Sequence, residues 1–254
     1  MGAIEMDMKN TMTVELPSAP HTVKRFDEEL ELLRTSILQM AEADQAQLER
    51  LADAFASMDA EAASEIAAND AVINAWELGI DKTLEIVFAR RSPHALDLRL
   101  LLGCSRMTTD LERLGDEIRN AAEGTARIAR SAQRLPASQE KALEALFRDV
   151  LDACREAVEV IRTLDGVRAR ALMKRRAAVS RSAKKALIDV IRAMECSPAV
   201  LLAGLEAIRI NRALERAAAH MENIGEGAVF IAEGNDLRHA GDAEEAGNED
   251  AEKP

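Results

Sequence analysis

The feature that most constrains this chain is an internal repeat. Residues 111–129 read LERLGDEIRNAAEGTARIA and residues 214–232 read LERAAAHMENIGEGAVFIA, so that Leu, Glu, Arg, Asn, Glu, Gly, Ile and Ala recur at a shift of 103. Two Ser-Pro pairs, at 92–93 and 197–198, lie 105 residues apart, which is nearly the same shift. Self-similarity at a fixed spacing predicts two copies of one structural unit of roughly 100 residues.

Each copy also carries an apolar stripe with helical spacing. The stripes step alternately by four and three residues, and their members are Leu100, Cys104, Met107, Leu111, Leu114, Ile118, Ala121, Thr125 and Ile128 in the first copy, and Ile210, Leu214, Ala217, Met221, Ile224, Ala228 and Ile231 in the second. A period of about 3.5 residues sustained over this length is typical of long helices that cross at about 20° and pack as a bundle or coiled coil. We therefore expect both stripes to lie in the core.

The composition supports a helical fold. The 254 residues include one Trp, no Tyr, five Phe and only 12 Gly, whereas Ala, Leu, Glu and Arg are abundant. A chain poor in aromatic residues and turn formers but rich in strong helix formers favours helices over sheets. Together with the repeat, this predicts an all-α protein built from two tandem, pseudo-repeated three-helix bundles.

Capping residues and prolines divide the repeated region into six helices. We expect the first three to occupy 26–57, 60–91 and 93–132, and the last three to begin near Ser138, Asp165 and Ser197. Asp59 and Asp165 are suitable N-cap residues, and Ser92-Pro93 supplies a cap followed by a first-turn proline.

These helices predict four segments. Residues 21–134 are expected to form the first three-helix bundle and residues 138–235 the second. Residues 1–20 precede them as a flexible arm. Residues 236–254 are acidic and lack periodicity, and such a composition is typical of a disordered tail.

Charge and hydropathy exclude several classes of protein. The formal net charge is −12, so a general nucleic-acid binder is disfavoured, because the phosphate backbone would be repelled. No stretch approaches 18 consecutive apolar residues, which predicts that nothing spans a membrane. The first 16 residues carry acids and lack the apolar centre of a secretory signal, so we expect a cytoplasmic protein.

The three cysteines are odd in number and lie far apart, at Cys104, Cys154 and Cys196. This spacing predicts neither a disulfide framework nor a CxxC redox or zinc pair. We expect all three to behave as small buried apolar residues in a reducing compartment.

Polar residues follow the flanks of two apolar stripes. One step after the stripe of the third helix lie Thr109, Glu112, Asp116, Asn120 and Glu123, and the corresponding line on the second helix comprises Asp70, Asn74, Glu77 and Asp81. The pairs Glu77–Asp81 and Glu112–Asp116 each place two carboxylates on one helix face, one turn apart. If the helices pack side by side, four carboxylates converge and raise one another's pKa. A hard or borderline cation would remove that repulsion.

The spacing alone leaves a second interpretation open. Acidic flanks of helices often form a solvated face or pair with arginine, and Arg113 and Arg119 are close in sequence. No Glu-x-x-His, Gly-rich phosphate loop, GxSxG or HExxH motif is present, so familiar enzyme chemistry is not indicated. The histidines form no ligand pair by spacing; they are His21, His94, His220 and His239.

At this point the residues resemble a known family. Residues 90–124, RRSPHALDLRLLLGCSRMTTDLERLGDEIRNAAEG, contain an R-x-x-P-x-A-x-DLR segment followed by an ERIGD-like segment, and this resembles the signature of the PhoU family. The acidic segment 70–81, DAVINAWELGID, is similar to the other acidic motif of that family. Residues 21–30 and 234–239 resemble its ends. The resemblance covers about residues 21–240.

The resemblance implies a function. It implies a cytoplasmic regulator of phosphate uptake that acts between the ATPase subunit of a phosphate ABC importer and a phosphate-responsive sensor histidine kinase. Such a protein keeps the phosphate-starvation genes off when phosphate is plentiful. A homodimer is also expected from it. Asp97 and Arg99, in the DLR match, would either hold the bundle by an ion pair or touch a partner.

The resemblance also implies metal clusters held by E/DxxxD motifs. Carried over residue by residue, the ligands in the first bundle are Glu77, Asp81, Glu112 and Asp116; Asp70 and Asn120 are weaker candidates on the same stripes. The metal is expected to be divalent or trivalent, namely iron, zinc, manganese or magnesium.

The second copy departs from this pattern. The positions that match the acidic stripes are Arg176, Ser180, Ala183 and Leu187 on the fifth helix and Arg212, Glu215, Ala219 and Asn223 on the sixth. One carboxylate stands where a full motif would give four, and two arginines have appeared. We therefore expect no metal site in the second bundle.

The stretch 168–185 is basic and contains no acid. It could be a solvated helix face, a docking surface for an acidic partner or inorganic phosphate, or a patch attracted to anionic lipid. Three functions follow from the sequence as hypotheses: the adaptor just described, a metal-dependent hydrolase of phosphate esters, and a structural bundle without a ligand. The hydrolase is disfavoured because no general acid or base stands beyond the predicted ligands.

Overall fold

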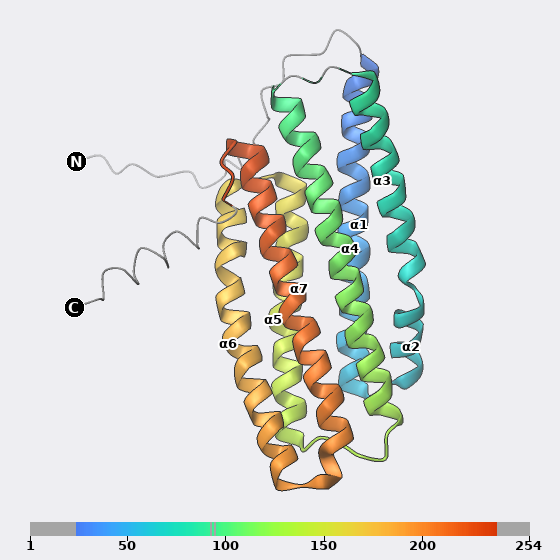
Figure 1. The fold of residues 1–254 in the computed structure, drawn as a ribbon, viewed down its shortest axis with the longest axis vertical. Helices are drawn as coiled ribbons and strands as arrows, with labels where there is room; N and C mark the ends of the chain where they lie inside the picture. The colour runs from blue at the N-terminus through green and yellow to red at the C-terminus, as the bar shows by residue number, and fades with distance from the viewer. Residues whose placement is uncertain (1–23, 92, 94, 238–254) are drawn as a thin grey trace, which may run out of the picture.

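The computed structural model describes residues 24–91, 93 and 95–237, and this part of the chain is helical throughout, with no strand (Figure 1). Its elements are α1 (Lys24–Ser57), α2 (Ala60–Ala68), α3 (Asp70–Arg90), α4 (Ala95–Arg130), α5 (Ala137–Thr163), α6 (Gly166–Cys196), the short 3₁₀ helix η1 (Pro198–Val200) and α7 (Leu201–Glu233). The all-α prediction is confirmed. The predicted arm at 1–20 lies outside the described residues, as does the predicted tail from residue 238 onward.

The expected second helix is wrong in one respect, because it consists of two helices, α2 and α3. Asn69 separates them with φ −88° and ψ 12°, and its N–H bonds to the carbonyl of Ile66, three residues back instead of four. Asparagine favours such local turns over helix interiors. The predicted cap is present, since Asp59 Oδ1 accepts the N–H groups of residues 61 and 62 at 3.0 Å each.

The other helix ends follow local chemistry. Asp165 caps α6 by accepting two backbone N–H groups of its first turn. α7 ends at Gly234, whose φ of +78° is left-handed and suits glycine. Both third helices follow their Ser-Pro pairs but begin slightly later than expected. Pro198 is the first residue of the turn η1, which precedes α7, and α4 begins at Ala95, two residues after Pro93.

The two copies share one continuous core. Every residue of the two predicted apolar stripes is buried on α4 and α7. The core also repeats between α1 and α5 at a shift of 106, because Ile37 matches Leu143 and Leu48 matches Cys154, and all four side chains are buried. Phe55 of α1 packs against Phe147 of α5 with ring centroids 5.1 Å apart. The core therefore crosses from one copy to the other.

The copies meet most closely along α4 and α7, which run antiparallel in Figure 1. Gly124 of α4 faces Ile210 of α7, where a Cβ would lie 2.8 Å from Ile210 Cγ1. Gly227 of α7 faces Met107 of α4 in the same way, with 3.3 Å to Met107 Cγ. Each contact matches the other at the 103-residue shift, so the seam has approximate two-fold symmetry. Glycine lets each helix receive the larger side chain of its partner.

Ion pairs at the edge of this seam fix its register. Arg216 of α7 makes a bidentate pair with Glu117 of α4, at 2.7 and 2.6 Å. Near one end, Arg127 Nε donates to Glu206 Oε2 at 2.8 Å. Because each pair joins residues far apart in sequence, they hold the two copies in one alignment.

The cysteine prediction holds for two of the three residues. Cys104 and Cys154 are buried, and burial raises the pKa of the Cys104 thiol to about 12, so it stays protonated. The prediction is wrong for Cys196, which is exposed. It is the last residue of α6, where the helix ends beyond the bundle core.

The close packing of α4 on α7 predicts opposite effects for the same substitution at two glycines. Gly103→Ala introduces a Cβ that overlaps the Ile231 side chain, so we expect a loss of about 1–3 kcal/mol in the free energy of unfolding. Gly79→Ala on α3 meets nothing within 4 Å and should raise it by about 0.5–1 kcal/mol. Urea unfolding of both variants measures the change in the free energy of unfolding. Equal changes in the two variants would contradict the close packing of α4 on α7.

Candidate metal centre

The predicted acidic residues lie beside a tightly packed seam between α3 and α4. On α3 the side chains of Ile73, Ile80 and Leu84 are buried against the core. The two helices approach closely at Gly115, where a Cβ would lie 3.2 Å from Ile73 Cγ2. Because Glu77 and Asp81 are offset from this apolar stripe, they fall at the edge of the seam and not inside it.

Three of the four predicted ligands influence one another. Glu77 is half-buried and Asp81 exposed on α3, while Glu112 and Asp116 are half-buried on α4. The pKa of Glu77 is raised, first by burial and then by the negative charges of Asp81 and Asp116. The helices therefore bring carboxylates from both sides of the seam into one electrostatic environment, as the spacing predicts.

The carboxylates are not assembled as a finished site. Arg119 Nη2 lies 2.9 Å from Asp116 Oδ1, so that acid is paired with an arginine of its own helix. Across residues 24–91, 93 and 95–237, no set of three or more His, Cys, Asp or Glu side chains stands in an arrangement that could hold a metal ion. Ligation would thus require Asp116 to exchange a guanidinium for the cation.

Of the two weaker candidates for metal ligands, the structure describes the side chain of Asn120 but not that of Asp70. Asn120 donates to Glu117 Oε2 at 3.3 Å, and Glu117 is the acid that pairs with Arg216 of α7. Asn120 is therefore engaged with a residue of the α4–α7 seam. Asp70 is the first residue of α3, and its side chain lies outside the described part.

A further carboxylate, which the sequence patterns did not single out, lies beneath the seam. Asp44 of α1 is fully buried, and a Cβ on Gly115 would lie 3.2 Å from Asp44 Oδ1. The available signal is its position, because it occupies a place in the apolar stripe of α1 that Val150 takes in α5 at the 106-residue shift. Buried Asp44 places a further carboxyl group below the acidic edge of α3 and α4.

The donor set suits a hard or borderline cation. All four predicted ligands are carboxylates, which such ions prefer, and they come from two helices that approach closely. The pKa of Glu77 is raised first by burial and, in addition, by the negative charges of Asp81 and Asp116. A bound cation would neutralise these carboxylates, so the chemistry of the donors suits the expected metal, whereas their present arrangement would have to change.

The predicted basic stretch on α6 separates into paired and exposed residues. Arg168 pairs with Glu156 and Glu159 of α5, and Arg170 makes a bidentate pair with Glu233 at the end of α7. Arg176 is half-buried and pairs with Glu215 and Glu222 of α7. The other five basic residues are exposed and make no ion pair within the described chain; they are Lys174, Arg175, Arg181, Lys184 and Lys185. The exposed face of α6 is thus positive.

One residue of the DLR match, Arg99, lies at the C-terminal end of the helical region. Asp97 is buried. The Arg99 guanidinium lies against Gly234, so closely that a Cβ there would overlap it. Next to it, Asp236 pairs with Arg106 at 3.5 Å, and Leu237 packs on the core. Asp236 and Leu237, which were predicted to belong to the disordered tail, therefore pack on the bundle.

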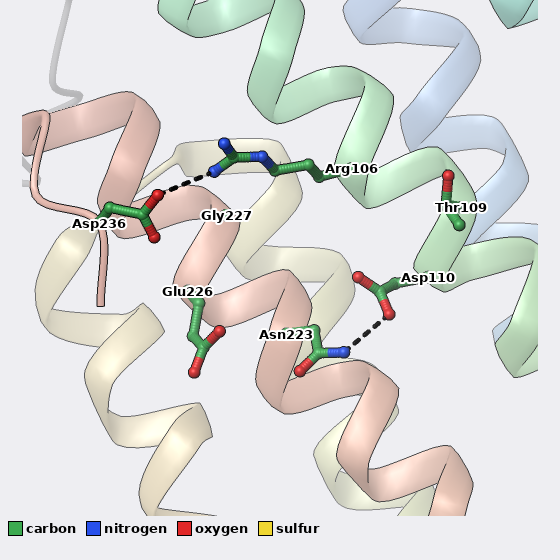
Figure 2. Close-up of a pocket in the computed structure, with 7 residues that line it drawn as sticks. All are labelled: Arg106, Thr109, Asp110, Asn223, Glu226, Gly227 and Asp236. Carbon is green, nitrogen blue, oxygen red and sulfur yellow. Dashed lines mark hydrogen bonds and ion pairs between the residues drawn. The ribbon is translucent and has the colours of Figure 1, made fainter. Parts of the chain in front are cut away.

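Figure 2 shows a cleft of about 400 Å³ between α4 and α7 at this place. Asp110 lies in it and accepts a hydrogen bond from Asn223 Nδ2 at 2.9 Å, while its Oδ1 is also 3.0 Å from His220 Nδ1. Arg106 stacks on the Phe230 ring, 4.6 Å from its centroid. These polar groups join α4 to α7, so the cleft belongs to the seam between the copies.

None of the described helices combines the length and apolar character that a membrane crossing needs.

The fold and the acidic seam define a class of protein: a tandem repeat of a three-helix unit, joined through its third helices, with a carboxylate-rich edge on the first copy. The PhoU domain matches residues 37–125 and again 143–228, once in each copy. The chain belongs to the PhoU family.

Characterised relatives extend over most of the chain. It is 28% identical over 219 residues to the phosphate-specific transport system accessory protein PhoU homolog of a Burkholderia species, covering 86% of this chain and 93% of the relative. It is 26% identical over 225 residues to the accessory protein PhoU of Escherichia coli K12, covering 87% and 90%.

Solved structures agree in fold. The crystal structure of PhoU from Pseudomonas aeruginosa superposes with a TM-score of 0.79 at 28% identity, covering 83% of this chain and all of that one. The phosphate transport system regulatory protein PhoU of Streptococcus pneumoniae has a TM-score of 0.75 at 23% identity, covering 83% and 98%, and shows the fold alone.

The raised pKa of Glu77 predicts how pH affects stability. Because the folded-state pKa lies above the ordinary value of 4.5, the folded chain holds this proton more tightly than the unfolded chain, and stability falls as pH rises from 4.5 through the folded-state pKa. In buffer with a chelator, Glu77→Gln should therefore be slightly more stable than the parent at pH 7, within about 0.5 kcal/mol, and the difference should vanish below pH 4.5.

Thermal unfolding across pH measures this effect. Glu85→Gln, at an exposed position of the same helix, is the matched control. A Glu77→Gln chain that is less stable than the parent at pH 7 without metal would contradict the repulsion at the seam.

Proposed function

We propose that this chain regulates phosphate uptake and the phosphate-starvation response as a cytoplasmic adaptor. It binds the ATPase subunit of a phosphate ABC importer and a phosphate-responsive sensor histidine kinase, and it represses the response when phosphate is plentiful. The observation that carries this proposal is the PhoU match in both copies, together with relatives named accessory proteins of the phosphate-specific transport system. The chain is accordingly a regulatory accessory protein of phosphate transport, not an enzyme.

Two faces of opposite charge support an adaptor role. The acidic edge of the first copy lies on α3 and α4, and the positive face of the second copy lies on α6. α3 and α6 occupy opposite edges of the bundle in Figure 1. Two partners can therefore dock at once without overlapping, each on a surface of complementary charge. A homodimer, also expected for this family, remains a prediction.

The metal forms part of the same proposal. Glu77, Asp81, Glu112 and Asp116 would hold iron, zinc, manganese or magnesium at the edge of the α3–α4 seam. When bound, the cation supplies positive charge that neutralises the carboxylates and ties the two helices together. Within this chain, Asp116 would leave Arg119, which lies 2.9 Å away, and turn toward α3. Such an exchange gives the first copy two charge states that a partner could distinguish.

A phosphatase reporter in cells that lack this chain tests the regulatory role. In phosphate-rich medium we expect high reporter output, because repression is lost, and basal output when the parent chain is restored. Asp81→Asn with Glu112→Gln should restore repression only partly, since the metal-bound form is removed. Basal output in the deletion strain would contradict repression by this chain.

The positive face of α6 generates a separate prediction. Lys184→Glu with Lys185→Glu reverses charge at exposed positions that make no ion pair within the described chain. We expect co-purification with one of the two partners to fall at least tenfold at high phosphate, while binding to the other persists. Lys141→Glu with Arg148→Glu, both exposed on α5, is the matched control. Equal loss in both variants would show that net charge matters and the α6 face does not.

A further inference from the structure

The seam between α6 and α7 is the counterpart of the acidic seam, and its charges are arranged differently. At the 106-residue shift of α3 to α6, Arg176 stands where Asp70 stands. At the 103-residue shift of α4 to α7, Glu222 stands where Arg119 stands, and Glu215 matches Glu112. The basic residue is therefore on the third helix in the first copy (Arg119) and on the second helix in the second copy (Arg176). The acidic residue is on the second helix in the first copy (Asp70) and on the third helix in the second copy (Glu222).

Direct contacts join these residues across the seam. Arg176 Nε lies 3.6 Å from Glu222 Oε2, and Arg176 Nη1 lies 3.9 Å from Glu215 Oε1. Ser180 Oγ donates to the same Glu215 oxygen at 2.8 Å. One guanidinium therefore sits between two carboxylates of α7, spaced seven residues and hence two helical turns apart.

The neighbouring positions at this seam also lack the carboxylates that a cation site needs. Ala183 and Ala219 stand where Glu77 and Asp116 stand in the first copy. Buried Asn211 donates to the carbonyl of Ala183 at 3.0 Å, so α6 and α7 are also joined by a side chain-to-backbone hydrogen bond. The single carboxylate at a matching ligand position, Glu215, already accepts a hydrogen bond from Ser180 and pairs with Arg176.

The cluster is partly shielded from water, which makes the charge balance matter. Exposed fractions are 28% for the Arg176 side chain and 33% for that of Glu222. Burial raises the pKa of Glu222, and the charge of Arg176 opposes that rise. Without the guanidinium, two half-buried acids would lose the positive charge that lies between them.

We propose that Arg176 is the resident cation of the second copy, so that the α6–α7 seam is closed permanently by a side chain of the chain itself and does not take a metal ion. The residues there do not fit the metal that the family implies. The second copy is therefore fixed in one charge state and does not respond to a cation. This inference concerns the stability of the second copy, so it holds or fails independently of metal binding at the first.

Unfolding of the full chain in buffer with a chelator tests the proposal. Arg176→Ala should lower the Tm by several degrees, and the backbone amides of residues 174–187 should exchange hydrogen at least tenfold faster. Arg175→Ala is the matched control, because the neighbouring Arg175 is exposed and makes no ion pair within the described chain. It should leave both quantities unchanged. Equal effects of the two variants would overturn the proposal.

A second variant separates charge neutralisation from loss of packing. In the Arg176→Ala background, Glu215→Gln with Glu222→Gln removes the two acids, and this should recover at least half of the lost Tm. The same pair of changes in the parent chain should lower the Tm, because the guanidinium would then lack its acids. If neutralising the acids restores nothing in the Arg176→Ala chain, Arg176 acts by packing alone and the proposal is wrong.

Discussion

The structure depends on the close contact of α4 with α7. Glycines at matching places on both helices receive Ile210 and Met107 from the partner helix, so the two copies share a single core. The contact holds α4 in one orientation, with acidic residues on two different flanks of the helix. One flank carries Glu117, which binds Arg216 of α7, and the other flank carries the carboxylates that face α3. The acidic edge is therefore held in place by the contact between the copies.

Duplication gave two corresponding seams, and their charges have diverged. In the first, acids face acids, and Arg119 on the same helix offsets only part of the repulsion. In the second, Arg176 crosses the seam and faces two acids directly. Repulsion between half-buried carboxylates destabilises the bundle, so retaining it makes physical sense where a ligand relieves it. The charges within the second seam are thus paired with one another, and the exposed basic residues of α6 form a separate positive face.

Local sequence patterns were sufficient to predict much of the fold. The 3.5-residue stripes on α4 and α7 predicted the buried residues, and Asp59 and Asp165 predicted helix starts, because caps and periodicity are properties of neighbouring residues. The break at Asn69 was missed, since the apolar spacing continues through it. Asp44 was also missed, because it interrupts an otherwise apolar stripe. The pairing of Arg216 with Glu117 joins residues 99 positions apart, and no local pattern contains that information.

Metal content of the full chain, measured by native mass spectrometry and elemental analysis, tests the central claim most directly. The claim is that the two seams differ in kind, one open to a cation and one closed by Arg176. It predicts that the parent chain binds metal, that Asp81→Asn with Glu112→Gln abolishes binding, and that Glu215→Gln with Glu222→Gln leaves the stoichiometry unchanged. A parent chain that binds no metal, or a loss of metal when the α7 acids are neutralised, would contradict it.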